Sequence, residues 1–384
     1  MRQINKQHLK ALTGIRFFAA IYVVLFHLGS EFDFPKPFRN LLQYGYIAVS
    51  FFFVLSGFIM AYNYLDYKNE SSVPYAKFWL ARFVRIYPVY LLSLILSLPA
   101  FFHNIRVEFT GQMTIVQASV IGAFTITLLQ AWTPWTVTQW NWPGWTLSAE
   151  AFFYLVFPFI AIYINRLSNK KIMFLIILLW FAALIVPIIY LISQLDELPT
   201  IGNSPTLRFI YYTPLFHLPQ FLIGVGGGII FLRKFSIQGV TSLENSRILF
   251  PVKIASIMTV AILTTIPGIP QGLLNNGLLA PLFVLIVYAL AHKKGLAVKI
   301  LSLRFITILG EVSYAIYILQ IPLYGWTSFF NKRLGFIEQG SSKFVIVYIF
   351  LLLLFSTLVF YILENPAKKF LKKWALNIFN SLEV

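Results

Sequence analysis

The chain has 384 residues, of which 59% are hydrophobic and only 11% are charged. Soluble domains carry about 25% charged residues, so the composition excludes a soluble globular fold and indicates an integral membrane protein. The net charge of +17 would also suit a nucleic-acid-binding protein, but the basic residues lie in short loops between apolar segments, as in membrane proteins. We therefore expect contacts with membrane lipids and none with nucleic acid. The absence of cysteine excludes disulfides and thiol nucleophiles, and we predict no metal site.

Apolar segments follow one another along the whole chain, each a candidate membrane-spanning helix. Their approximate limits are 12–30, 43–64, 80–101, 114–131, 146–165, 172–192, 209–232, 251–268, 276–291, 306–327 and 343–363. We predict an all-α polytopic membrane protein made of a single domain, residues 1–384, whose last span is followed by a basic tail at 364–384.

The charges of the loops reduce the number of crossings to about ten. Lysine and arginine gather before the first segment and in the tail 364–384, so both termini should be cytoplasmic, which requires an even number of crossings. The conflict lies between Arg85 and Arg166, where 114–131 is the weakest segment, with polar side chains such as Gln117 and Thr125. We predict that it is re-entrant, since backbone packed within protein need not cross the bilayer. The chain would then be a multi-pass protein of the inner or plasma membrane.

Two basic side chains, Arg16 and His27, lie inside the first segment. Their separation of eleven positions is close to three helical turns, so they share one helix face about 16 Å apart along the axis. A charge inside a span costs about 2.5–3.5 kcal/mol and often marks a functional site. An imidazole can take a proton from a hydroxyl near neutral pH. A snorkelling arginine and a hydrogen-bonded interhelical histidine are the structural alternatives.

Arg82 and Arg85 lie at the cytoplasmic start of the third span. A spacing of three residues puts both guanidinium groups on one helix face, where each can bind phosphate oxygens in a bidentate manner. The pair therefore predicts a site for a phosphorylated ligand. Simple anchoring at the inner membrane surface is the alternative interpretation.

The fifth segment begins in a stretch rich in tryptophan and carries a carboxylate near its outer end. Glu150 needs a partner there, and we expect it to orient a histidine or to bind an acceptor hydroxyl; a structural ion pair is the alternative. The tryptophans fit either an aromatic belt or a platform on which a sugar stacks. They are Trp132, Trp135, Trp140, Trp142 and Trp145.

Together these stretches resemble the acyltransferase-3 family of integral-membrane O-acyltransferases. The matching motifs run in the family's order from residue 11 to about residue 320. They are Arg16 with His27, Phe52–Phe58, Arg82 with Arg85, Ser148 with Glu150, Phe153 and Tyr154, and Ser313 with Tyr314 and Tyr317. The resemblance implies ten spans and transfer of an acyl group, usually acetyl from acetyl-CoA, to a hydroxyl of a carbohydrate or another cell-surface acceptor. It implies no tightly bound cofactor.

The resemblance also assigns expected roles to residues. It implies that His27 and Arg16 are essential and that Arg82 and Arg85 belong to the acyl-donor site; we add Glu150 as a catalytic residue. The predicted acceptor or supporting residues are Ser148, Tyr154, Trp145, Ser313, Tyr314 and His217.

Two positions depart from the family's pattern. Gln320 stands where the family often has a histidine, and the family's Arg-x-x-Glu-Phe reads His217-Leu-Pro-Gln220-Phe221 here. The second departure leaves His217 as an alternative candidate base and suggests a different acceptor.

Our hypothesis for the mechanism has His27 acting as a general base on an acceptor hydroxyl that attacks the thioester of acyl-CoA. A histidine-bound acyl intermediate is the competing route. The expected acceptor is an extracytoplasmic carbohydrate such as an exopolysaccharide, an O-antigen or a lipid-linked glycan. A transporter or flippase of such a glycan, and the same fold with another donor such as succinyl-CoA, remain alternatives.

Overall fold

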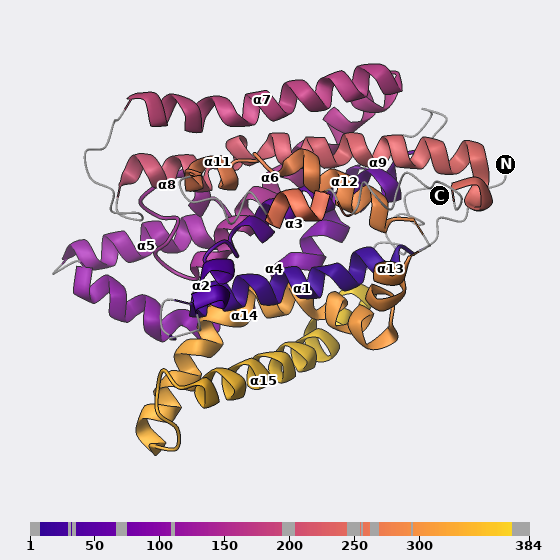
Figure 1. Ribbon diagram of the computed structural model, residues 1–384. Coiled ribbons are helices and arrows are strands. Elements are labelled where there is room, and N and C mark those ends of the chain that lie inside the picture. The colour runs from indigo at the N-terminus through magenta and orange to yellow at the C-terminus, as the bar shows by residue number, and fades with distance from the viewer. Residues whose placement is uncertain are drawn as a thin grey trace, which may run out of the picture.

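The computed structural model describes residues 8–29, 32, 36–66, 75–108, 112–193, 204–243, 254, 256–261, 269–292 and 295–370. In this part of the chain the regular elements are all helical, and Figure 1 shows them as a bundle of long helices lying side by side. The helices are α1 (Lys10–Leu28), α2 (Lys36–Leu42), α3 (Ile47–Tyr64), α4 (Tyr75–Glu108), α5 (Gln112–Ile126), α6 (Trp145–Arg166), α7 (Asn169–Ser193), α8 (Pro205–Tyr212), α9 (Pro214–Leu243), α11 (Gln271–Asn275), α12 (Ala280–Leu290), α13 (Leu296–Leu301), α14 (Arg304–Leu334) and α15 (Ser342–Val359). Three short elements join them: η1 (Gln130–Trp132), η2 (Trp142–Gly144) and the π-helical η3 (Phe360–Glu364).

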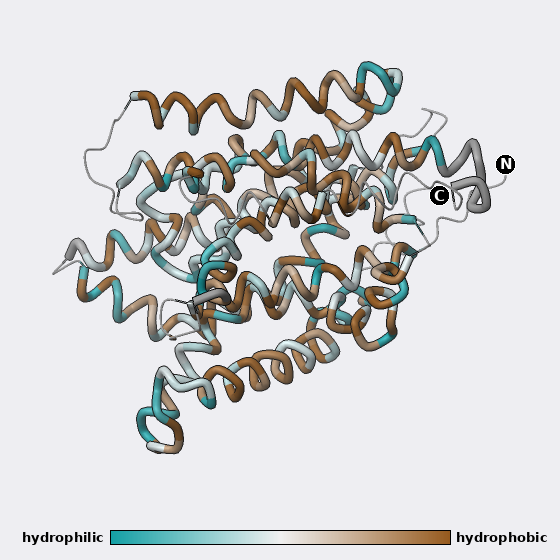
Figure 2. The backbone as a smooth tube through the Cα atoms, in the orientation of Figure 1, coloured by the Kyte–Doolittle hydropathy of each residue, from teal (hydrophilic) through white to brown (hydrophobic). Residues whose placement is uncertain are grey.

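Within the described residues, nine helical stretches are long and apolar enough to cross a membrane. They match nine of the ten predicted crossings, which confirms an all-α polytopic membrane protein. The stretches that contain α7 and α15 have the highest mean hydropathy and expose most of their surface. Figure 2 shows them as predominantly hydrophobic helices along two borders of the bundle. Apolar side chains that face away from the protein are what lipid contact requires.

The segment around 114–131 forms α5, which has only 15 residues, fewer than the about 20 that a crossing needs. It packs against α4, where the hydroxyl of Tyr90 donates to the carbonyl of Thr125 at 2.7 Å. The neighbouring helices also show that α5 does not cross. Helices α3 and α6 run in the same direction: Phe53 meets Trp145 near their first turns, and Asn165 donates to a carbonyl just past the end of α3. Two successive helices that run in the same direction need one crossing between them. Helix α4 makes that crossing, so α5 does not cross as well.

The predicted span 251–268 lies mostly outside the described residues. The helices on either side of it run in the same direction. Near the start of α9, Gln220 donates to the carbonyl of Asn275, and further along both helices Phe231 packs on Tyr288. These two contacts show that α9 and α12 are parallel.

Glycines allow the central helices to cross at close range. A Cβ on Gly57 would lie 2.0 Å from the carbonyl oxygen of Phe221, and one on Gly224 would lie 2.0 Å from that of Val54, so α3 and α9 pack backbone to backbone. Gly310 in α14 makes the same approach to the carbonyl of Thr13 in α1. This second close contact between helices places the part of α1 that carries Arg16 against α14.

Candidate active site

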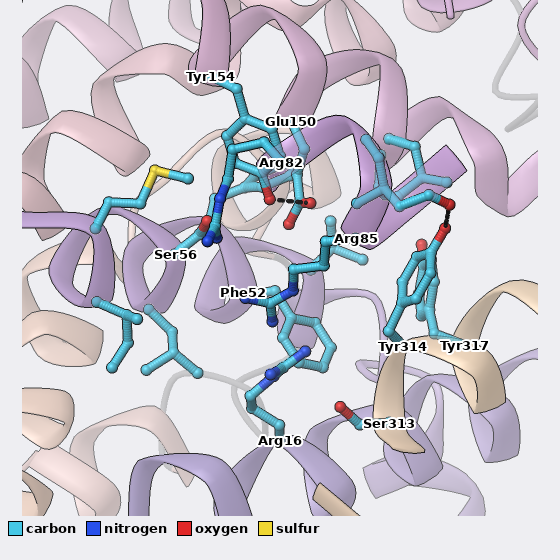
Figure 3. Close-up of a pocket in the computed structure, with 18 residues that line it drawn as sticks. Arg16, Phe52, Ser56, Arg82, Arg85, Glu150, Tyr154, Ser313, Tyr314 and Tyr317 are labelled. Atoms are coloured by element: carbon cyan, nitrogen blue, oxygen red, sulfur yellow. Dashed lines mark hydrogen bonds between the residues drawn. The ribbon is translucent and has the colours of Figure 1, made fainter. Parts of the chain in front are cut away.

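A pocket that several charged side chains line lies between α1, α3, α4, α6 and α14, as Figure 3 shows. It encloses about 820 Å³, including its open mouth. The sequence-predicted residues that line it are Arg16, Arg82, Arg85, Glu150, Tyr154, Ser313 and Tyr314. Segments far apart in the chain therefore contribute to one pocket, and it contains all three predicted arginines.

Arg16 and Arg85 point into the pocket from α1 and α4 (Figure 3). Neither makes a hydrogen bond or an ion pair to another described residue. The pocket wall supplies one carboxylate, Glu150, against three guanidinium groups. A guanidinium has five N–H donors and binds a carboxylate or phosphate through two of them. The pocket is therefore suited to an anionic ligand.

Arg82 is held more firmly than the other two arginines. One of its terminal nitrogens donates to the hydroxyl of Tyr64 at 2.9 Å, and its guanidinium lies 5.4 Å from the centre of that ring. The Tyr154 ring lies on another side, 5.9 Å away. Its Nε is buried and has no hydrogen-bond partner among the described residues. Aromatic faces stabilise a cation without using up its donors, so Arg82 keeps donors available for a ligand.

Glu150 also lies in this pocket, although it is only in the second turn of α6. The Tyr154 hydroxyl donates to its carboxylate at 2.6 Å. The sequence placed Glu150 near the outer end of its span and the arginines near the opposite end. Glu150 is indeed near the start of its helix, but it lies beside the arginines and not opposite them, because α6 begins partway along α4. Gln130 joins the two helices there by donating to the hydroxyl of Tyr90 at 3.1 Å and to the carbonyl of Gly144 at 2.8 Å.

Helix α14 forms the wall opposite α3. Ser313 is buried and donates to the carbonyl of Gly310 one turn earlier, while Tyr314 donates to the carbonyl of Ile86 on α4. Tyr317, one turn further along, also lines the pocket. The Tyr314 bond ties α14 to α4 on this side of the pocket.

His27 faces α14, as Arg16 does, which agrees with the predicted common face of α1. It is not among the residues that line the pocket. Its Nδ1 lies 2.9 Å from the side-chain oxygen of Gln320, which is one turn beyond Tyr317. The Trp142 ring meets it edge-on, with 5.0 Å between ring centres. His27 therefore lies about one helical turn, roughly 5 Å, beyond the end of the pocket. Gln320, and not Glu150, makes the hydrogen bond that orients it.

Three other predicted residues lie elsewhere. His217 is fully buried; its Nε2 is 2.8 Å from the carbonyl of Tyr211 and its Nδ1 is 3.2 Å from the amide of Gln220. Both ring nitrogens are thus engaged inside the protein, which favours a structural role. Trp145 is also buried and packs on the His217 ring, so it has no surface to offer a sugar. Ser148 is buried outside the pocket, and its hydroxyl has no hydrogen-bond partner among the described residues.

Sequence reasoning missed three residues around the site. Gln320 stood out only as a departure from a pattern, and Trp142 as one tryptophan among several. Glu364 is buried in the π-helical turn η3 and lies close enough to Arg16 for their charges to interact. One of its oxygens accepts from Lys368 and the other has no partner among the described residues. A buried carboxylate near the end of a long apolar segment was the signal that could have revealed it.

Comparison with known proteins identifies the family. The sequence model described as "Acyltransferase domain" matches residues 9–364. The chain belongs to this family, acyltransferase-3. It is therefore an integral-membrane acyltransferase, as the motifs predicted. No solved structure matches the chain.

Curated relatives within the family match nearly the whole chain. "Acyltransferase MdmB" of Streptomyces mycarofaciens is 26% identical over 94% of this chain and 92% of that protein. "Peptidoglycan O-acetyltransferase OatA" of Listeria monocytogenes is 23% identical over 95% of this chain, which corresponds to 56% of that protein. "O-acetyltransferase OatA" of Staphylococcus aureus is 23% identical over 96% of this chain and 58% of that protein. The chain thus spans little more than half of the two OatA proteins.

Proposed function

We propose that this acyltransferase moves an acyl group, acetyl in the first instance, from acyl-CoA to a hydroxyl of an extracytoplasmic carbohydrate. The observation that carries the proposal is the pocket in which Arg16 and Arg85 have no protein partner among the described residues. Coenzyme A carries several phosphate charges, which are the groups that arginine binds best. The names of the OatA relatives support acetyl as the group and a glycan as the acceptor.

The donor would bind with its phosphates against Arg85, Arg82 and Arg16. The remaining pocket wall is largely apolar, with residues such as Phe52 and Met60, and suits the thin pantetheine arm. The arm would run along α14 toward His27. Nothing in this arrangement discriminates acetyl-CoA from succinyl-CoA, so the identity of the acyl group belongs to the test.

His27 would serve as the base for the transfer. The acceptor oxygen attacks the thioester carbonyl carbon as His27 takes the hydroxyl proton; the carbon–sulfur bond breaks, and the thiolate leaves and receives that proton, giving CoA thiol and an ester. General-base assistance is worth about 10²–10⁴-fold. Attack by the imidazole itself, with a histidine-bound acyl intermediate, is the competing route.

The acceptor would approach from the side of His27 that carries Trp142. This ring is 43% exposed although it touches the His27 ring. Among the tryptophans of the stretch, Trp140 is stacked on Phe101 and bonded to a backbone carbonyl, and is thus part of the packing. An exposed aromatic face beside the base suits the apolar face of a sugar ring, so we assign the stacking interpretation to Trp142.

The charge pattern of the loops supplies the orientation. We propose that both termini are cytoplasmic, that the arginine pocket opens toward the cytoplasmic donor, and that His27 lies toward the outer face of the inner or plasma membrane. Arg16 is in the second turn of α1 and His27 in its last turn, so the two would mark the two ends of one route. A single domain would then contain both the donor site and the acceptor site.

The proposal is tested by supplying labelled acetyl-CoA or succinyl-CoA to membranes that contain the protein and analysing the envelope glycans by mass spectrometry. We expect a base-labile increment of one acetyl group on a carbohydrate, absent from membranes without the protein. A protein that binds acyl-CoA but leaves every carbohydrate unmodified would refute the assigned acceptor class. A succinyl increment alone would refute the assigned donor.

A further inference from the structure

The side chain of Gln320 is buried and its orientation is defined by two neighbours. Its nitrogen lies 2.7 Å from the carbonyl oxygen of Tyr317. A carbonyl oxygen only accepts hydrogen bonds, so the nitrogen of Gln320 must be the atom that faces it. The other end of the amide, the oxygen Oε1, therefore faces Nδ1 of His27 at 2.9 Å. The Gln320 backbone is held as well, because Tyr348 donates to its carbonyl at 2.8 Å.

This arrangement decides which ring nitrogen of His27 carries the proton. An amide oxygen is an acceptor only, so Nδ1 must be protonated to make the hydrogen bond. In a neutral imidazole the other nitrogen, Nε2, then holds a lone pair. Nε2 has no hydrogen-bond partner among the described residues. His27 is thus presented as a base with its reactive atom available.

We infer that Gln320 is a positioning residue: it holds His27 in the Nδ1-protonated tautomer and so leaves Nε2 free to accept the proton of the acceptor hydroxyl. This inference rests on the proposed function, which makes His27 the base. It gives a role to the position where the chain departs from the pattern of its family. An uncharged partner orients the imidazole without stabilising its protonated form as strongly as a carboxylate would, which keeps His27 neutral and competent as a base.

A second glutamine–histidine pair in the same protein shows what a structural pair looks like. Gln220 and His217 are both buried and lie 3.2 Å apart. There Nε2 bonds to the carbonyl of Tyr211, so it carries the proton and Nδ1 accepts from the Gln220 amide. No ring nitrogen is left for chemistry. The Gln220 pair is therefore a matched control for the Gln320 pair.

Two substitutions at Gln320 separate positioning from packing. Gln320→Met keeps the volume and removes the acceptor, so His27 can adopt either tautomer; we expect the turnover number to fall about 10- to 100-fold, part of the value of a general base. The KM for acetyl-CoA should not change, because the arginines are untouched. Gln320→Glu again provides a hydrogen-bond acceptor, unlike Gln320→Met, but this acceptor is negatively charged and favours the imidazolium. It should recover part of the lost rate and move the acidic limb of the pH–rate profile upward by about one pH unit.

The measurement is labelled acetyl transfer to envelope glycan in membranes, from pH 5 to 9, with each variant normalised to the amount of folded protein. Gln220→Met serves as the control and should keep the wild-type pH profile and turnover. The inference is overturned if Gln320→Met turns over like the wild type, or if the Met and Glu variants are equally slow with an unshifted profile. His27→Ala is measured in parallel: an active His27→Ala would refute the proposed function itself, whereas an inactive one beside a normal Gln320→Met would refute only the positioning role.

Discussion

Replacing Arg85 by methionine separates a ligand-binding arginine from a structural one. Arg85 shares a pocket with Arg16 and Arg82 and has no protein partner among the described residues. Its loss should leave the unliganded protein as stable as before, or more stable, because one of three like charges is removed from a pocket with a single carboxylate. Binding of the donor should suffer instead. A hydrogen bond to a charged group contributes about 1.5–3 kcal/mol, so the KM for acetyl-CoA should rise about 10- to 100-fold.

Arg233 is the matched control. Its guanidinium donates to the carbonyl of Leu167 at 2.8 Å and to the side chain of Asn169 at 2.9 Å, so it ties α9 to the start of α7. Arg233→Met should lower thermal stability and leave the KM for acetyl-CoA unchanged.

The assay for both arginine variants combines thermal unfolding in detergent, with and without CoA, and a titration of acetyl-CoA against CoA thiol release. The protein has no cysteine, so a thiol reagent detects released CoA without background from the chain. Saturating CoA at one hundred times its Kd should stabilise the wild type by about 2.7 kcal/mol, and Arg85→Met much less at the same concentration. An Arg85→Met protein that unfolds more easily but keeps the wild-type KM would show that Arg85 is structural.

Three further substitutions probe other parts of the account. Trp142→Ala should raise the KM for the glycan acceptor about 2- to 10-fold, the value of an aromatic stacking contact, without changing the KM for acetyl-CoA. Trp135→Ala, which removes a more exposed ring, should change neither KM. Equal effects of the two substitutions in acceptor titrations would contradict the role assigned to Trp142. Tyr154→Phe removes the hydroxyl that donates a 2.6 Å hydrogen bond to the carboxylate of Glu150. That carboxylate should then compete with acetyl-CoA for the arginines and raise the KM for acetyl-CoA. An unchanged KM would contradict this role of Tyr154. Gly224→Ala places a Cβ 2.0 Å from a carbonyl oxygen and should sharply lower the yield of folded protein in fluorescence-detected gel filtration, whereas Gly325→Ala, which meets nothing within 4 Å, should be tolerated.

The bundle was predictable because its strongest determinants are local. Apolar length gave the crossings and loop charge excluded 114–131 as a span; α5, with 15 residues, agrees. The site was only partly predictable. Arg16, Arg82 and Arg85 are recognisable in the sequence as cations inside or beside apolar segments, and in the structure they line the same pocket. Which carboxylate meets them was not visible, because it depends on where α6 begins along α4.

The surroundings of the two histidines illustrate the same limit. From sequence, His27 and His217 were both candidate bases. The difference between them lies in their hydrogen bonds. Both ring nitrogens of His217 are hydrogen-bonded, one to the Tyr211 carbonyl and one to Gln220, whereas His27 forms one such bond, to Gln320. Those partners come from helices distant in the chain, and one sequence does not reveal which helices are neighbours.

In the proposed mechanism His27 drives acyl transfer from a CoA thioester to an extracytoplasmic carbohydrate. The most direct test follows radiolabel from acetyl-CoA into base-labile ester on envelope glycan, comparing the wild type with His27→Ala and with His103→Ala, a control at an exposed histidine of α4. We predict that the wild type and His103→Ala label the glycan at the same rate and that His27→Ala, although normally folded, labels it at least about 10²-fold more slowly. Labelling by His27→Ala at the wild-type rate would contradict the account.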